Sequence, residues 1–146
     1  MGPYTVDRFA SSANAKLHRF NSLFWNPGSE AIDAVSQNWF SENNWLVPPI
    51  DLVIRAIIHL VACKAKCTLI VPKWKSATFL PLIFNKNLEY KPYVKDVIEF
   101  SNTCGIFEQW SNKNTNFGVE PFGTQILAVC LMQIVDDMAL ISTEIL

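Results

Sequence analysis

Apolar and polar positions follow two different spacings along the chain, and the more regular one predicts a helix. Over residues 50–66, apolar side chains recur every three or four positions and would line one face of a helix. Asp51 lies in the expected first turn, and Lys64 and Lys66 lie in the last, as the helix dipole favours. We predict one helix packed on a sheet, with a stripe formed by Ile50, Val53, Ile54, Ile57, Ile58, Val61, Ala62 and Ala65.

Apolar runs on both sides of this helix predict strands. Residues 43–47 are followed by two prolines that end the run, and residues 67–72 form a continuous apolar stretch that also ends at a proline. A strand, a helix and a strand in this order predict a β-α-β unit. Its two strands should be parallel and its crossover right-handed.

Weaker patterns fill the rest of the chain. We expect a short strand at residues 5–10, a polar loop at 11–14, a turn at 26–29 and a short strand at 31–35. Residues 77–84 suggest a short helix interrupted by Pro81, residues 94–100 fit either a helix or a strand, and residues 125–134 suggest a final strand. The class that emerges is α/β with a mostly parallel sheet, as a single domain over residues 1–134 with a C-terminal tail over 135–146.

Composition fits this architecture and narrows the setting of the protein. The chain has 146 residues, of which 50% are hydrophobic and 17% charged, which argues against global disorder. No apolar run approaches the roughly 20 residues that span a bilayer, so we expect no membrane partner. The sequence opens without a signal peptide and without a long N-terminal region, so we expect a piece of a larger protein.

The cysteines and histidines do not predict a metal site. Cys63 and Cys67 are four positions apart, and neither histidine is spaced to complete a cluster with them. We therefore expect reduced, partly buried thiols and a cytoplasmic or nuclear protein.

Charge is nearly balanced overall but uneven along the chain. The net charge is −1, yet residues 55–95 carry eight basic side chains against one acid, Glu89, which gives +7. Such a segment is compatible with phosphate contact, through Lys64, Lys66, Lys73 and Lys75, and equally with a solvated face.

Two stretches that follow predicted strands carry the candidate chemistry. They are Asp7-Arg8-Phe9-Ala10-Ser11 and Trp45-Leu46-Val47-Pro48-Pro49-Ile50. In an open α/β sheet, ligands bind beyond the carboxyl ends of strands, so both loops are expected to border one crevice.

Residues 6–84 resemble the methyltransferase-like segment of DIRS-like (tyrosine-recombinase) retrotransposon polyproteins, which is similar in turn to phage adenine-N6 DNA methyltransferases. The resemblance covers a little over half of the chain and implies a Rossmann-like (methyltransferase-like) sheet flanked by helices. It rests on the order and spacing of the two stretches above together with Trp25-Asn26-Pro27-Gly28, Ala31-Ile32-Asp33-Ala34 and Val71-Pro72-Lys73-Trp74.

The loop that would hold the target base departs from the family pattern. That pattern is Asn or Asp, two prolines and an aromatic residue: a side-chain oxygen accepts from the exocyclic amine, and the ring stacks on the flipped base. Here Val47 has no acceptor and Ile50 has no planar ring, although Pro48 and Pro49 keep the loop shape. The resemblance with this departure predicts a domain that does not catalyse methyl transfer.

The loop for S-adenosylmethionine is better preserved. The resemblance implies that Asp7 accepts from the methionyl ammonium, that Phe9 and Ala10 pack against the cofactor, and that Asp33 binds the adenosine part. The alternative, which the damaged partner loop favours, is that Asp7 anchors a loop and Phe9 is part of the core. We therefore expect no cofactor, or S-adenosylmethionine if the pocket survives.

Three functions stay open at this point. The first is a non-catalytic methyltransferase-like domain that binds nucleic acid weakly or binds other domains of the polyprotein. The second is an active S-adenosylmethionine-dependent DNA amino-methyltransferase with an unrecognised acceptor. The third is a ribonuclease H-like nuclease, which would need Asp7, Asp33 and Asp51 to share metal ions. Asp136-Asp137 resembles the paired aspartates of reverse transcriptases, but the chain is too short for that enzyme, and we interpret the pair as an acidic tail.

Overall fold

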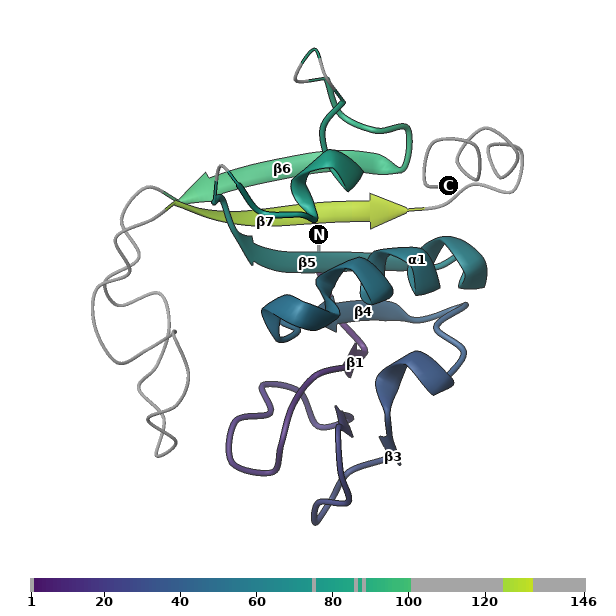
Figure 1. Ribbon diagram of the computed structural model, residues 1–146. Helices are drawn as coiled ribbons and strands as arrows, with labels where there is room; N and C mark the ends of the chain where they lie inside the picture. Colours follow the sequence, from purple (N-terminus) through teal and green to yellow (C-terminus); the bar gives the residue numbers. More distant parts are fainter. Residues whose placement is uncertain (1, 75, 86, 88, 101–124, 133–146) are drawn as a thin grey trace.

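A five-stranded sheet forms the centre of the molecule (Figure 1). The computed structural model describes residues 2–74, 76–85, 87, 89–100 and 125–132. Across the sheet the strands are β1 (Val6–Asp7), β4 (Asn43–Leu46), β5 (Lys66–Pro72), β7 (Ile126–Met132) and β6 (Val94–Phe100).

The direction of the strands confirms a mixed α/β fold with a mostly parallel sheet. Strands β1, β4 and β5 pair in parallel, whereas β7 runs antiparallel to both β5 and β6. Because β7 is reversed relative to both of its neighbours, β6 runs in the same direction as β5. Four of the five strands therefore share one direction.

The predicted strand, helix and strand around Pro48 and Pro49 form a β-α-β unit. A 3-10 turn, η2 (Ile50–Leu52), leads from β4 into α1 (Val53–Cys63), and β5 follows in parallel to β4. The prediction placed the helix end too late. Lys64 has φ 54°, a left-handed conformation that ends the helix, and Lys66 already belongs to β5.

The buried stripe of α1 is rotated from the predicted one. Its buried residues are Val53, Ala56, Ile57, Leu60 and Val61, which follow the i, i+3, i+4, i+7, i+8 pattern of one helix face. The sequence pattern instead included Ile58, which is 45% exposed, and Ala62, which is also exposed. Ile58 directly follows Ile57 and Ala62 directly follows Val61, so the sequence pattern alone did not show which residue of each pair is buried.

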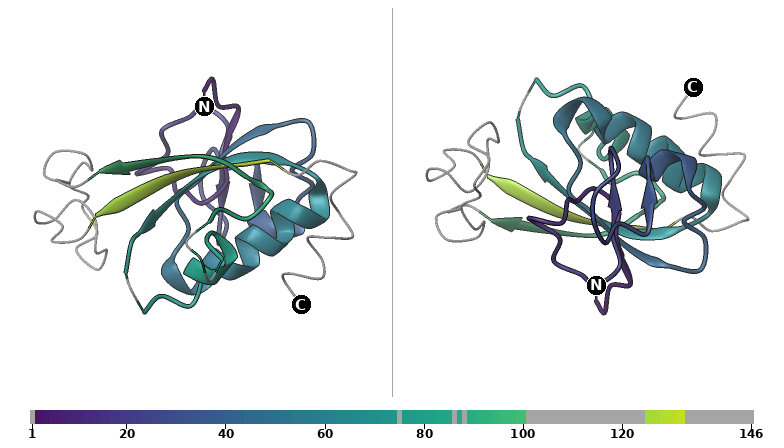
Figure 2. Two further views of the ribbon diagram at one scale, coloured as in Figure 1. Left: turned by 90° about the horizontal axis from the view of Figure 1, so that it is seen from above. Right: turned by 90° about the horizontal axis from the view of Figure 1, so that it is seen from below.

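Helix α1 covers one face of the sheet, together with the segment around η3 (Leu80–Leu82) (Figure 2). This face holds the main core, whose largest fully buried side chains include Trp39, Leu46, Ile57, Leu60, Leu69, Phe79, Ile83, Tyr93, Leu127 and Leu131. On the opposite face a small cluster of Ile70, Ile126 and Ala128 packs against Trp45 and Val47. Within the described residues α1 is the one α-helix, so the predicted Rossmann-like sheet flanked by helices is not confirmed.

Short elements between β1 and β4 form a second, two-stranded sheet. Strands β2 (Asn21–Ser22) and β3 (Ala31–Ile32) pair in parallel, and η1 (Ala34–Ser36) follows. The strand predicted at residues 31–35 ends at Ile32 because Asp33 adopts a left-handed φ of 56°. Similarly, the strand predicted at 5–10 is reduced to β1, and β2 was not predicted.

Residues 94–100, whose pattern fits either a helix or a strand, form strand β6. This strand lies at an edge of the five-stranded sheet. Its pairing with β7 shifts register between Val94 and Asp96. The Asp96 carboxylate accepts a hydrogen bond of 2.9 Å from the Val97 backbone N–H, and Lys95, Asp96 and Glu99 are exposed. The strand predicted at 125–134 corresponds to β7.

None of the helices in the described part of the chain is both long enough and apolar enough to cross a bilayer. The predicted tail with Asp136-Asp137 lies outside the described residues.

Candidate functional site

The two candidate loops leave neighbouring strands at the same edge of the sheet. Asp7 at the end of β1 is in register with Trp45 in β4, and the Arg8 N–H donates to the Trp45 carbonyl at 3.0 Å. Because β1 and β4 are parallel, the segments that follow these two strands leave the sheet at the same end. The loop that follows Asp7 and the loop that begins at Val47 are therefore neighbours, as the sequence predicts.

The Asp7 carboxylate is buried and bound to its own loop. It is 3% exposed, and its two oxygens accept from the backbone N–H groups of Phe9 and Lys16, both at 3.4 Å. Burial raises the pKa of Asp7, while these N–H groups and the Lys16 charge partly counteract that shift. An anchoring role for this carboxylate accounts for both of these hydrogen bonds.

The remaining residues predicted to hold a cofactor also have structural roles. Phe9 packs on the main core with its ring edge-on to Trp39, at 6.4 Å between centroids. The Ala10 N–H donates to the Asn21 carbonyl, which ties this loop to β2. Asp33 lies in a different loop, after β3, where its carboxylate accepts from the Ser36 hydroxyl at 2.8 Å.

Val47 and Ile50 of the proline loop are half-buried and pack on the protein, whereas Pro49 is exposed. Val47 packs against Ile70 and its neighbours on one face of the sheet, and Ile50 packs against the main core on the other. Pro48 is buried, and the Pro49 carbonyl accepts from the Leu52 N–H as η2 begins. The two positions where the family pattern carries polar and aromatic groups therefore belong to the hydrophobic packing of this chain.

The lysines predicted to contact nucleic acid do not form one cluster. Exposed Lys64 and Lys66 lie where β5 begins, whereas Lys73 follows its end, about 20 Å away for a strand of this length. Lys73 is also paired with Glu99, with 2.9 Å between Nζ and Oε1. Lys75 lies outside the described residues.

A buried arginine is the feature that sequence reasoning missed. Arg8 is 4% exposed, and its guanidinium donates to Asn44 Oδ1 at 2.7 Å and to Asn21 Oδ1 at 2.8 Å. The carbonyl of Asn38 lies 3.5 Å from Nη2, and the Trp39 ring centroid lies 5.9 Å from Cζ. Burial lowers the pKa of Arg8. Arg8 lies inside the strand predicted at residues 5–10, and the sequence pattern gave no signal of this role.

The Arg8 network connects the two sheets. Asn44 lies in β4 and Asn21 in β2, so one side chain joins both to the loop after β1. The Asn44 amide nitrogen also donates to the carbonyls of Trp39, Glu42 and Lys66. The Asn21 amide nitrogen is buried and has no hydrogen-bond partner among the described residues. This network is polar, buried and structural.

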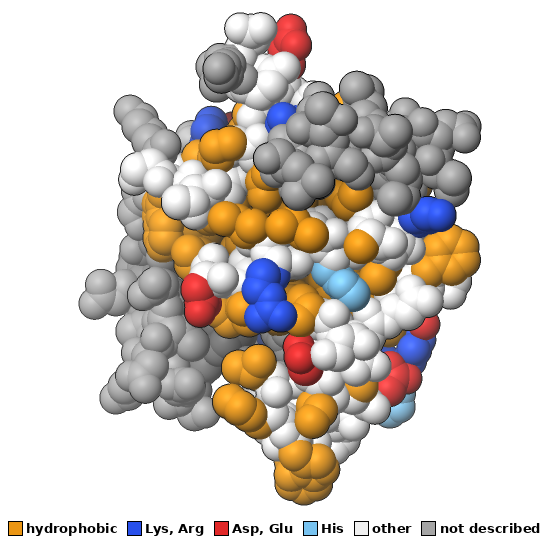
Figure 3. All heavy atoms as spheres, turned by 45° about the vertical axis from the view of Figure 1, so that its right-hand side comes forward, with side chains coloured by type: hydrophobic (Ala, Val, Ile, Leu, Met, Phe, Trp, Pro, Cys, Tyr) orange, Lys and Arg blue, Asp and Glu red, His pale blue; other side chains and the backbone are white. Residues whose placement is uncertain are grey.

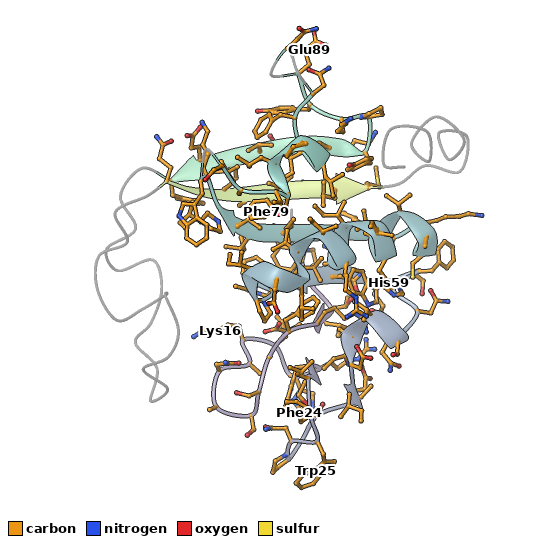
Figure 4. The ribbon with its side chains drawn as sticks, viewed as in Figure 1. Lys16, Phe24, Trp25, His59, Phe79 and Glu89 are labelled. Carbon is orange, nitrogen blue, oxygen red and sulfur yellow. The ribbon has the colours of Figure 1, made fainter. Side chains whose placement is uncertain are left out.

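A histidine and a cysteine on α1 approach each other but do not form a nucleophile and base. His59 Nε2 lies 2.6 Å from the Gln37 carbonyl and 3.2 Å from Cys63 Sγ (His59 is labelled in Figure 4). A carbonyl oxygen only accepts, so Nε2 carries the proton and cannot remove one from the thiol. Cys63, Cys67 and Cys130 are free thiols, and burial raises the pKa of Cys67 well above its usual range. Cys104 lies outside the described residues.

The acidic side chains proposed for a nuclease are not grouped together in the part of the chain that the structure describes. No three His, Cys, Asp or Glu side chains among those residues are grouped so that they could hold a metal ion. Asp7, Asp33 and Asp51 therefore do not meet the requirement of a ribonuclease H-like nuclease.

Comparison of the chain with protein-family models, curated proteins and solved structures finds no match.

Proposed function

We propose that this chain is a non-catalytic methyltransferase-like domain of the kind found in DIRS-like retrotransposon polyproteins, and that it acts by binding rather than by catalysis. The packing of Val47 and Ile50 carries the proposal. A base loop needs an acceptor directed at the target amine and a ring facing the base. In this chain both side chains are instead held in the hydrophobic packing.

The energetic cost of this loop explains why catalysis is not expected. Losing one preorganised partner of the developing charge typically costs about 3 kcal/mol or more, and losing a stacking ring costs roughly a further 1–3 kcal/mol. At about 1.4 kcal/mol per tenfold in rate, turnover falls by several orders of magnitude. Asp7 adds to this, because its carboxylate already accepts from two backbone N–H groups.

Methyl transfer from radiolabelled S-adenosylmethionine to duplex and single-stranded DNA tests the proposal. The unmodified chain should transfer no detectable label to DNA. Label transfer well above that of a heat-denatured control would overturn the proposal. The double variant Val47→Asn with Ile50→Tyr sharpens the test. Label transfer by this variant alone would show that the lost side chains are the cause and that the cofactor pocket is intact.

Weak binding of nucleic acid is the second part of the proposal, and it rests on the charge of residues 55–95. We expect binding that does not depend on the nucleic-acid sequence. The logarithm of its association constant should fall with the logarithm of the salt concentration. Changing both Lys64 and Lys66 to Gln should weaken binding and reduce the salt slope by about two. Arg19→Gln is the matched control, since Arg19 lies outside the segment and is paired with Glu30 and Glu42. An absence of binding at low salt would remove this part of the proposal.

A further inference from the structure

Four large apolar side chains are exposed at the end of the molecule that carries β2 and β3. Leu23, Phe24 and Trp25 directly follow β2, and Ile32 lies in β3. Their exposed fractions are 56%, 77%, 77% and 51%, respectively. Figure 4 labels Phe24 and Trp25 at this end, and Figure 3 shows hydrophobic side chains protruding there. We call these four residues the apolar tip.

Hydrogen bonds, rather than burial of its rings, hold the backbone of the apolar tip in place. The Ser22 hydroxyl lies 2.6 Å from the Phe24 carbonyl and 2.9 Å from the Ser29 hydroxyl. The Ser12 N–H donates to the Asn26 side-chain oxygen at 2.6 Å, which ties the following turn to the loop after β1. A loop that is fixed in this way loses little conformational freedom on binding.

The exposed area is comparable to the largest apolar patch of a typical monomer, and such patches are often functional. At 77% exposure, Phe24 and Trp25 alone present on the order of 300 Å² of apolar surface. This already equals the lower limit of the largest apolar patch on a typical monomer, roughly 300–600 Å². A standard protein interface buries about 800 Å² per partner, so a contact through the apolar tip should be weak and reversible.

Charges around the apolar tip select among partners. Residues 16–33 carry Lys16 and Arg19 against Glu30 and Asp33, which gives a net charge of zero with His18 neutral. Arg19 lies 3.0 Å from Glu30, so opposite charges stand side by side. A nucleic acid requires an excess of cations, which this segment does not have. Two copies of a neutral surface of mixed charge approach without net repulsion.

We propose that the apolar tip is a self-association surface, through which two copies of this chain form a weak symmetric dimer. In a twofold arrangement every favourable contact occurs twice, so one patch needs complementarity only to itself. Aromatic rings satisfy this condition because they pair edge-to-face with their own kind. The apolar tip lies at the opposite end of the molecule from β6, which leaves room for end-to-end contact (Figure 1).

Sedimentation equilibrium of the chain over about 1 μM to 1 mM tests the proposal. The expected result is a reversible monomer–dimer equilibrium whose Kd rises about tenfold or more in Phe24→Ser with Trp25→Ser. Ile98→Thr is the matched control, because Ile98 is 43% exposed on β6 and should leave the Kd unchanged. A Trp25→Glu variant provides a second measure, since it places two negative charges against each other at the twofold axis and should abolish the dimer.

Several outcomes would overturn the proposal. A chain that stays monomeric up to the highest concentration has no self-association surface. A dimer that persists in Trp25→Glu, or that is lost equally in Ile98→Thr, uses another surface. A monomer whose tryptophan fluorescence is quenched by single-stranded oligonucleotides, with the quenching lost in Trp25→Ser, has an apolar tip that binds nucleic acid instead. Thermal unfolding of each variant should match that of the parent, because the substituted side chains are exposed.

Discussion

The region between β1 and β4 and the region around β5 bury different kinds of side chain. Of the six buried polar or charged residues in the described part of the chain, five lie between the end of β1 and β4, and the sixth is Thr68 in β5. The five are Asp7, Arg8, Asn21, Ser22 and Asn44. Around β5 the interior is apolar and arises from regular strands and one helix. The first region is fixed by specific hydrogen bonds, and the second by the removal of apolar surface from water.

The two kinds of interior should respond differently to substitution and to solvent. Apolar burial contributes through area and packing, and it depends little on pH or salt. A buried polar network contributes through geometry, because one lost partner leaves another group unsatisfied. Ranked by size, the following changes test this difference.

The largest effect is expected in the apolar region. Ile57 is fully buried on α1, so Ile57→Ala should lower the free energy of unfolding by about 2–5 kcal/mol. Urea denaturation measures the change. Ile58→Ala on the same helix is the control, since Ile58 is 45% exposed and should cost far less. Equal losses at both positions would mean that the stripe is not the buried face.

The second effect tests the polar region. Arg8→Met keeps much of the side-chain volume but removes the donors to Asn21 Oδ1 and Asn44 Oδ1. The two asparagine oxygens left without a donor destabilise the folded state, whereas removal of the buried cation stabilises it. We expect the free energy of unfolding to fall by about 1–3 kcal/mol. Arg55→Met on the exposed face of α1 should be nearly neutral. A gain in stability for Arg8→Met would show that the buried charge costs more than its hydrogen bonds return.

The third effect is a pH dependence of the polar region. Burial raises the pKa of Asp7 in the folded chain, so the folded state binds its proton more tightly than the unfolded state does. The contribution of this group to stability is therefore greatest at low pH, and it is lost as pH rises from the unfolded pKa through the raised folded pKa. Asp7→Asn removes this dependence, whereas Asp51→Asn, at an exposed position, should not.

Melting temperatures of the parent and Asp7→Asn across this pH range provide the measurement. The difference between them should shift in favour of the parent as the pH falls. A shift in the opposite direction would mean that the hydrogen bonds from Phe9 and Lys16 lower the pKa of Asp7 by more than burial raises it.

The smallest effect is expected at the surface of the polar region. Arg19 is paired with Glu30 at 3.0 Å, and both side chains are more than 40% exposed. Exposed pairs contribute little, so Glu30→Gln should cost less than about 1 kcal/mol, and the cost should shrink at high salt. A larger loss that is insensitive to salt would place Glu30 in the buried network rather than at its rim.

The same contrast explains what could be predicted from the sequence. The β-α-β unit was predictable because the spacing of apolar residues over 50–66 indicates a helix between two strands, although the buried face of Val53–Cys63 is rotated from the predicted stripe. Its end was not, because the left-handed turn at Lys64 leaves no hydrophobic signature. For the candidate site, the sequence alone showed that Val47 has no hydrogen-bond acceptor in its side chain. Only the structure shows that this side chain packs against Ile70.

The polar region was the least predictable part of the fold. β2 and β3 contain two residues each, too few for any period. The partnership of Arg8 with Asn21 and Asn44 joins positions 13 and 36 residues apart, which only the three-dimensional structure brings together. Asp7 was predicted to lie near the end of a strand, and it does, but its contact with the Lys16 N–H depends on the path of the chain after the strand.

The irregular edge at β6 has a consequence for the behaviour of the protein at high concentration. A new strand adding to this edge would meet a register shift, exposed charges at Lys95 and Glu99, and a Val97 N–H already occupied by the Asp96 carboxylate. Features of this kind oppose the stacking of strands that nucleates amyloid fibrils. Concentrated solutions of the folded chain should therefore remain free of fibrils, and removing the Asp96 carboxylate is the substitution that we expect to promote their growth.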